Sequence, residues 1–170
     1  YYICVAMLLG VTFIVLQPSA TYYSWDDQIH FANVLQIRGG NIKWNVGELS
    51  MIDSSPIGRG SINSIEEQFN QMRYLNKNEF SNFQTSSSKF VPYNKIAYIP
   101  SAVGYYFCKL LKLPFSVCFK VGKITNLLSF VLIMAYAIKI SKLGKRLLCV
   151  IGLMPMVLFL SSQYSYDPAV

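Results

Sequence analysis

Long uncharged apolar runs restrict what this chain can fold into. Residues 147–166 form 20 consecutive positions without a charged side chain, and residues 1–17 form another such run. A helix needs ~20 largely apolar residues to cross the hydrocarbon core of a bilayer. Over the whole chain, 53% of the residues are hydrophobic and only 14% are charged, which excludes a disordered chain and a typical soluble domain. We therefore predict an all-α membrane protein.

Three segments are apolar enough to be transmembrane helices, and we place them at residues 1–17, 115–140 and 147–166. The first begins inside an apolar run and lacks the basic start and cleavage site of a signal peptide, so we interpret it as a truncated span. The second contains Lys120 and Lys123, whose long side chains can reach one interface. The expected architecture is the N-terminal fragment of a polytopic helical bundle with about three transmembrane helices.

Residues 96–112 are ambiguous between a span and a surface helix. Their uncharged part is short and ends in Lys109 and Lys112, which are three residues apart and share a helix face. We predict an amphipathic juxtamembrane helix that lies in the membrane interface, with a span as the alternative.

The net charge of +7 is distributed unevenly. Residues 18–95 contain equal numbers of acidic and basic side chains, whereas residues 96–170 contain eight basic side chains and one acid. A soluble nucleic-acid-binding protein would not place its positive charge in its most apolar half, so we expect no nucleic acid partner and expect membrane lipids instead.

The densest basic cluster predicts the topology. Lys139, Lys142, Lys145 and Arg146 surround a turn at residues 141–146, which the positive-inside rule places in the cytoplasm. Residues 18–95 then form a large first extracytoplasmic loop, and residues 167–170 begin the next outer loop.

Short helices are expected within the first outer loop. Residues 28–38 have apolar side chains at helical spacing and are followed by two glycines, which predicts a helix. In residues 41–46, apolar and polar side chains alternate, which predicts a short strand. Ser64 and Glu67 form a capping-box pattern that opens a helix with Ile65, Phe69 and Met72 on one face. The four cysteines lack metal-site spacing, and we expect them to be small buried apolar residues.

Carboxylates provide the first candidate site. Asp26 and Asp27 are adjacent just after the first span, so their repulsion should make one of them hold its proton more tightly. Such a group can act as a general base or bind a metal. His30 follows within one helical turn. Asp167 ends the last apolar run, where an acid is a functional candidate. The alternatives are a helix N-cap for the acidic pair and a solvated helix end for Asp167.

Basic and amide side chains provide the second candidate site. Lys120 and Lys123, with Asn126 one turn further on, could attract a lipid phosphate, or they could simply anchor the helix at the interface. Tyr93 and Asn94 could line a sugar or headgroup pocket, or they could belong to an aromatic belt.

Several short motifs occur in an order that resembles a family of bacterial multipass membrane proteins of unknown function. The acidic pair and His30 match its opening motif. A second match lies at residues 93–100, where Lys95 replaces a proline that is usual in the family. The remaining matches are Lys123 with Asn126, and residues 144–145, 153–156 and 165–167. That family in turn resembles the GT-C glycosyltransferases, which use lipid-linked sugars.

This resemblance implies an inverting sugar transfer from a polyprenyl-phosphate carrier to an acceptor outside the bacterial cytoplasmic membrane. Asp26 or Asp27 would act as base or would help bind a divalent cation, Mg²⁺ or Mn²⁺. Asp167 would orient the acceptor or the metal, and Lys120 and Lys123 would stabilise the leaving phosphate. The alternatives are a non-enzymatic transporter or polysaccharide-export component, and an outer loop that binds a partner through its tryptophans.

Overall fold

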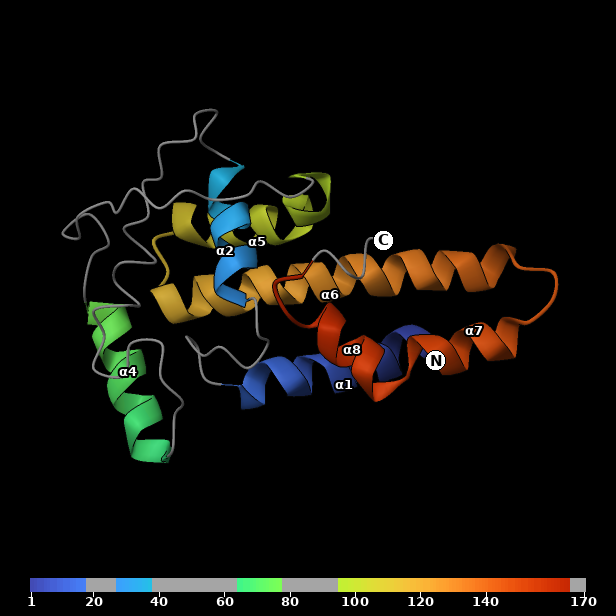
Figure 1. Ribbon diagram of the computed structural model, residues 1–170, viewed down its shortest axis with the longest axis horizontal. Coiled ribbons are helices and arrows are strands. Elements are labelled where there is room, and N and C mark those ends of the chain that lie inside the picture. Colours follow the sequence, from blue (N-terminus) through green and yellow to red (C-terminus); the bar gives the residue numbers. More distant parts are fainter. Residues whose placement is uncertain (18–26, 38–63, 78–94, 166–170) are drawn as a thin grey trace.

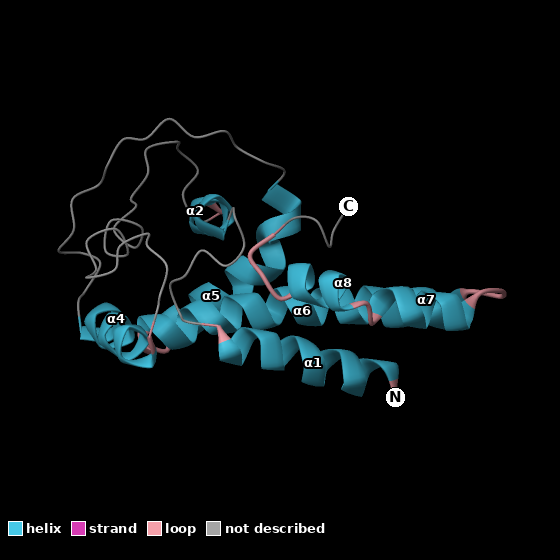
Figure 2. Ribbon diagram, turned by 60° about the horizontal axis from the view of Figure 1, so that its bottom comes forward, coloured by secondary structure: helices cyan, strands magenta, loops and turns pink. Residues whose placement is uncertain are grey.

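The computed structural model describes residues 1–17, 27–37, 64–77 and 95–165, and regular structure in these ranges is entirely helical (Figures 1 and 2). The strand predicted at residues 41–46 lies outside the described residues. The helices are α1 (Tyr2–Leu16), α2 (Asp27–Gln36), α4 (Ile65–Lys77), the 3₁₀ turn η2 (Lys95–Tyr98), α5 (Ile99–Leu110), α6 (Phe115–Ile140), α7 (Lys145–Gly152) and α8 (Pro155–Ser161).

Helix α6 is the element against which the others pack. Its 26 residues extend for about 39 Å, and within the described ranges it is the one helix that is long and apolar enough to cross a membrane. α1 is a shorter apolar helix and packs against the second half of α6 (Figure 1). The approach is close at Gly10, where an added Cβ would lie 2.5 Å from the side chain of Leu127.

Helix α5 runs antiparallel to the first half of α6, to which a short turn joins it (Figure 1). Lys112 in this turn has a φ of 56°, and Pro114 caps the start of α6. The two helices touch at Gly104, where an added Cβ would lie 2.3 Å from Oγ1 of Thr125. The helix expected within residues 96–112 is therefore present, and it lies alongside α6.

The apolar segment at residues 147–166 is divided into two helices. α7 ends at Gly152 and α8 begins at Pro155, with Met154 in an extended conformation at ψ 132°. Proline has no amide hydrogen and disfavours a helical residue before it, which favours the break seen at this point. The expectation of one uninterrupted helix is corrected to two short ones, the first of which returns along α6 (Figure 1).

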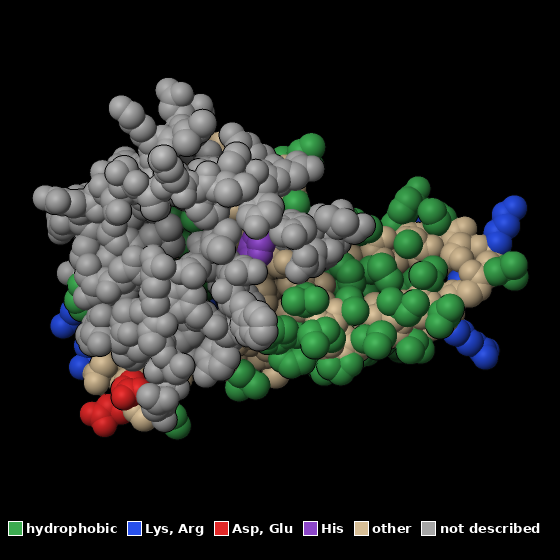
Figure 3. Space-filling model, in the orientation of Figure 1, with side chains coloured by type: hydrophobic (Ala, Val, Ile, Leu, Met, Phe, Trp, Pro, Cys, Tyr) green, Lys and Arg blue, Asp and Glu red, His purple; other side chains and the backbone are tan. Residues whose placement is uncertain are grey.

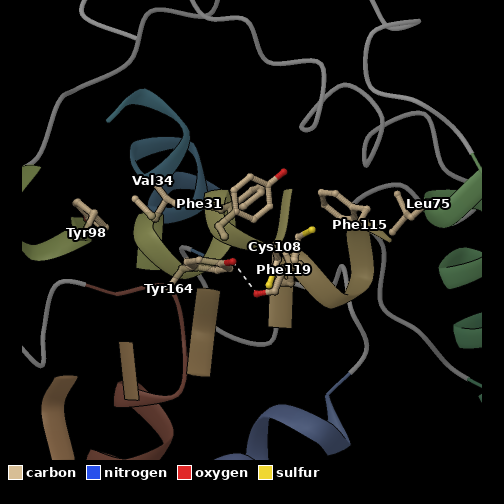
Figure 4. Packing of buried hydrophobic residues seen from close by; sticks show 11 residues of the cluster. Phe31, Val34, Leu75, Tyr98, Cys108, Phe115, Phe119 and Tyr164 are labelled. Carbon is tan, nitrogen blue, oxygen red and sulfur yellow. Dashed lines mark hydrogen bonds between the residues drawn. The ribbon is translucent and has the colours of Figure 1, made fainter. Parts of the chain in front are cut away.

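Two apolar clusters lie along α6. Around its second half, α1 and α8 contribute Ala6, Ile14 and Leu158 to a purely aliphatic and aromatic core. Around its first half, α2, α4 and α5 form a cluster rich in aromatic rings, in which Phe31 is central (Figure 4). Hydrophobic side chains also cover the outside of α1, α7 and the second half of α6, and Lys and Arg side chains gather at the α6–α7 tip (Figure 3).

Helix α4 starts as its sequence predicts, but it buries a different face. The Oγ of Ser64 accepts a hydrogen bond of 3.1 Å from the Glu67 amide, as an N-cap should. Ile65 and Phe69 of the predicted apolar face are exposed, whereas Leu75 and the polar Gln71 are buried. The side of α4 that contacts the start of α6 is therefore not the face formed by Ile65 and Phe69. Of the cysteines, Cys108 and Cys118 are buried as expected, and Cys4 is exposed.

Enlarging Gly104 should weaken the α5–α6 pair. Thr125 is stiff at χ1, so the Cβ of Gly104→Ala would force the two helices apart and lower the free energy of unfolding by about 1 to 3 kcal/mol. Thermal unfolding in detergent, followed by circular dichroism, measures this loss. Thr125→Ala should restore part of it, and Val103→Ala on the exposed side of α5 is the matched control. Equal effects at positions 103 and 104 would contradict the close packing.

Candidate functional site

A buried ammonium group lies where the two apolar clusters meet. Lys123 on α6 is 2% exposed, and its Nζ lies 2.8 Å from Oε1 of Gln163 and 3.4 Å from Oε1 of Gln17. The same Nζ lies 5.1 Å from the ring centre of Phe119 and 5.8 Å from that of Tyr164. Amide oxygens and aromatic faces both stabilise a cation in a low-dielectric setting. Lys123 thus connects the ends of α1 and α8 to α6.

Asn126, one turn further along α6, holds the chain that follows α8. Its Nδ2 lies 2.9 Å from the carbonyl oxygen of Gln163, 3.4 Å from that of Ser161 and 3.5 Å from that of Ser165. The last carbonyls of a helix have no partner within it, so a side-chain amide at this position replaces the missing donors. The buried residues 161–165 are therefore fixed to α6 immediately before the predicted site residue Asp167.

Tyr164 is held within the aromatic cluster by both its hydroxyl and its ring. The hydroxyl donates a hydrogen bond of 2.7 Å to the carbonyl oxygen of Phe119 (Figure 4). Gly122 leaves room for this hydroxyl, since an added Cβ there would lie 2.3 Å from it. The ring of Tyr164 lies 5.0 Å from that of Phe31, measured between centres. The segment before Asp167 thereby contacts α2, which begins at Asp27.

His30 is also built into the aromatic cluster. It is 6% exposed, and its Nδ1 lies 2.7 Å from the hydroxyl oxygen of Tyr98, which is itself buried. The imidazole belongs to α2 and the phenol to η2, so this hydrogen bond connects α2 to the start of α5. A buried imidazole paired with a hydroxyl can donate or accept a proton, depending on its tautomer.

The predicted site residues are only partly brought together. Lys123 and Asn126 converge on Gln163, whereas Lys120 is half-buried, and no hydrogen bond or ion pair joins it to another described residue. Four other predicted residues lie outside the described part of the chain, namely Asp26, Tyr93, Asn94 and Asp167. The side chain of Asp27 also lies outside it.

Sequence reasoning missed Gln17, Gln163 and the role of Tyr98. The signal for Gln163 was present, because it stands in a short polar run at the end of an apolar segment. Gln17 likewise ends the first apolar run. Neither position could be paired with Lys123 before the crossing of the helices was known.

The described residues do not by themselves form a metal centre. Among them, no three His, Cys, Asp or Glu side chains gather closely enough to hold an ion. The divalent-cation hypothesis requires the carboxylates at positions 26, 27 and 167. The structure does not describe these three side chains. That hypothesis therefore stays a prediction.

In the described part of the chain, apolar helices pack around one central helix that is long and apolar enough to cross a membrane, and polar groups are buried where they meet. This is the arrangement expected of a helical membrane protein. The sequence matches the family described as "Predicted membrane protein (DUF2142)" over residues 7–170, and the chain belongs to this family. No curated protein and no solved structure matches the chain.

Replacing Gln163 should test whether its side chain stabilises the buried Lys123. Gln163→Leu removes the nearest acceptor from a buried ammonium, which should lower the free energy of unfolding by about 2 kcal/mol. Gln17→Leu is the matched control and should cost less, because its oxygen is further from Nζ. Adding Lys123→Met to Gln163→Leu should recover part of the stability, since the buried charge that lost one of its acceptors is then gone. Unfolding in detergent measures all three. An additive loss in the double variant would show that the two side chains do not interact.

Proposed function

We propose that this protein is a membrane glycosyltransferase of the bacterial cytoplasmic membrane that transfers a sugar from a polyprenyl-phosphate carrier to an extracytoplasmic acceptor. The observation that carries the proposal is the contact between Phe31 and Tyr164 at 5.0 Å. Phe31 lies four residues after Asp27, and Tyr164 lies three residues before Asp167. Two segments far apart in the sequence, each with a candidate catalytic acid, therefore lie against the same part of α6.

The proposed reaction is a single in-line displacement. The acceptor hydroxyl oxygen forms a bond to the anomeric carbon, and the bond from that carbon to the carrier phosphate breaks. Asp26 or Asp27 takes the hydroxyl proton as general base, and the electron pair of the broken bond leaves on the phosphate oxygen. One displacement inverts the anomeric centre.

The remaining candidates bind and orient the reactants in this proposal. Lys120 and Lys123 stabilise the leaving phosphate, with Lys123 held in place by Gln163. Asp167 orients the acceptor, and the imidazole of His30 lies on the helix that begins at the acidic pair. Tyr93, Asn94 and Asn126 complete the candidate binding set. A divalent cation, Mg²⁺ or Mn²⁺, would be held by Asp26 and Asp27 and would supply charge stabilisation.

Neutralising the acidic pair tests this function. Asp26→Asn and Asp27→Asn keep the side-chain shape but remove the base. At least one of these variants should therefore reduce the amount of cell-surface glycan about 100-fold or more, because general-base catalysis contributes at least about that factor to the rate. The glycan is measured in cells that carry only the variant, with protein levels matched. Asp53→Asn, in the same outer segment, is the control and should leave the glycan unchanged. Normal glycan in both variants would remove the acidic pair from catalysis.

The broken α7–α8 segment favours a second candidate function. Interrupted helices are typical of transporters, and here Leu153 and Met154 separate α7 from α8, while the polar residues 161–165 end α8 and follow it. A transporter would move a lipid-linked or free glycan without forming a glycosidic bond. Loss of function would then leave a completed glycan on the cytoplasmic side, whereas loss of a transferase would leave unused donor and acceptor outside.

A further inference from the structure

The exposed face of α5 is apolar throughout. Ile96 in η2 and Ile99, Val103, Phe107 and Leu110 in α5 form an apolar stripe, and their exposed fractions range from 46% to 79%. They are spaced three or four residues apart, as one face of a helix requires. No charged residue occurs between Ile96 and Lys109. A helix that faced water would place polar side chains on this face.

The lysines of α6 give a depth scale for this stripe. Lys120 and Lys139 are 19 residues apart on one continuous helix, which corresponds to about 28 Å along its axis. The hydrocarbon core of a bilayer is ~30 Å thick. With the ammonium groups of both lysines at the two interfaces, residues between them lie at the level of the hydrocarbon.

Helix α5 extends below the interface that Lys120 marks. Gly104 contacts Thr125, which lies five residues inside the boundary, about 7 Å deep. Because α5 is antiparallel to α6, residues before Gly104 lie deeper and residues after it lie shallower (Figure 1). Leu110, between Lys109 and Lys112, is then at the interface, while Ile99 is about 16 Å further in along the helix axis.

The residue types of α5 indicate that its outer face meets lipid. Helix–helix contacts within membranes use small residues, which let two backbones approach. The small residues of α5 face α6, where Ser101, Ala102 and Gly104 are buried. Bulky aliphatic and aromatic side chains remain outside, as lipid chains permit.

We propose that α5 is a re-entrant helix that inserts from one interface to about half the depth of the bilayer, and that the apolar stripe binds the acyl chains of membrane lipids. Lys109 and Lys112 remain near the lipid phosphates. The polar contact between His30 and Tyr98 then lies below the headgroup level, shielded from lipid by protein. This inference is independent of the proposed sugar transfer, because it rests on helix packing and on residue types.

A spin-label depth series tests the proposal. Single cysteines at Ile99, Val103, Phe107 and Leu110 are labelled in a background with Cys4→Ala and Cys149→Ala, in phosphatidylcholine vesicles. Cys108 and Cys118 are buried, so both should stay unlabelled. The ratio of the spin label's collision rates with oxygen and with a nickel chelate gives the depth of the label in the bilayer. We expect depth to increase steadily from Leu110 to Ile99, by about 16 Å in total.

Control positions define the two ends of this scale. Leu128, exposed in the middle of α6, should report the hydrocarbon interior, and Ile65 on α4 should report water. Equal depths at the four α5 positions would overturn the proposal, since a helix lying flat in the interface gives that result. Low collision with both reagents would also overturn it, because the stripe would then be covered by protein.

A second measurement uses the unmodified chain and does not depend on the cysteine variants. Phosphatidylcholine with a diazirine near the middle of its acyl chain should label the peptide that contains Val103 when irradiated. The exposed Phe69 of α4 should not be labelled. Labelling of Phe69 with none at Val103 would contradict the proposed insertion.

Discussion

The hydrogen bonds from Asn126 fix the end of α8, and the short segment after it, to α6. In hydrocarbon, a carbonyl released by the end of a helix has no water to pair with, so a protein donor must replace it. Asn126 supplies that donor at Gln163 and, more weakly, at its neighbours. This places the Gln163 side chain against Lys123 and the Tyr164 ring against Phe31. One amide thereby links the core around α1 to the core around α2.

Much of the fold could be predicted from residue types alone. Uncharged length predicts the apolar helices, and the capping-box pattern at Ser64 predicts the start of α4. Both are local properties of the chain, set by solvent preference and backbone hydrogen bonding. The membrane class follows from them and agrees with the family to which the chain belongs. The number of spans, their orientation and the activity stay predictions.

Contacts between helices were harder to predict, for a physical reason. Pro155 could be tolerated in a membrane helix or could break it, and only the neighbouring packing decides between these outcomes. The direction of α5 depends on the fit of Gly104 to Thr125, which sequence spacing does not reveal. The environment of Lys123 depends on glutamines 106 residues before it and 40 residues after it. Such partners become visible only when the crossing of the helices is known.

The space beside Gly122 has a consequence for how this family can change over evolution. A side chain at position 122 and a hydroxyl at position 164 would occupy the same volume. A larger residue at 122 therefore becomes acceptable only after position 164 has lost its hydroxyl or its ring. We expect these two positions to vary together among homologues, so that a pair of individually harmful substitutions persists as a neutral combination.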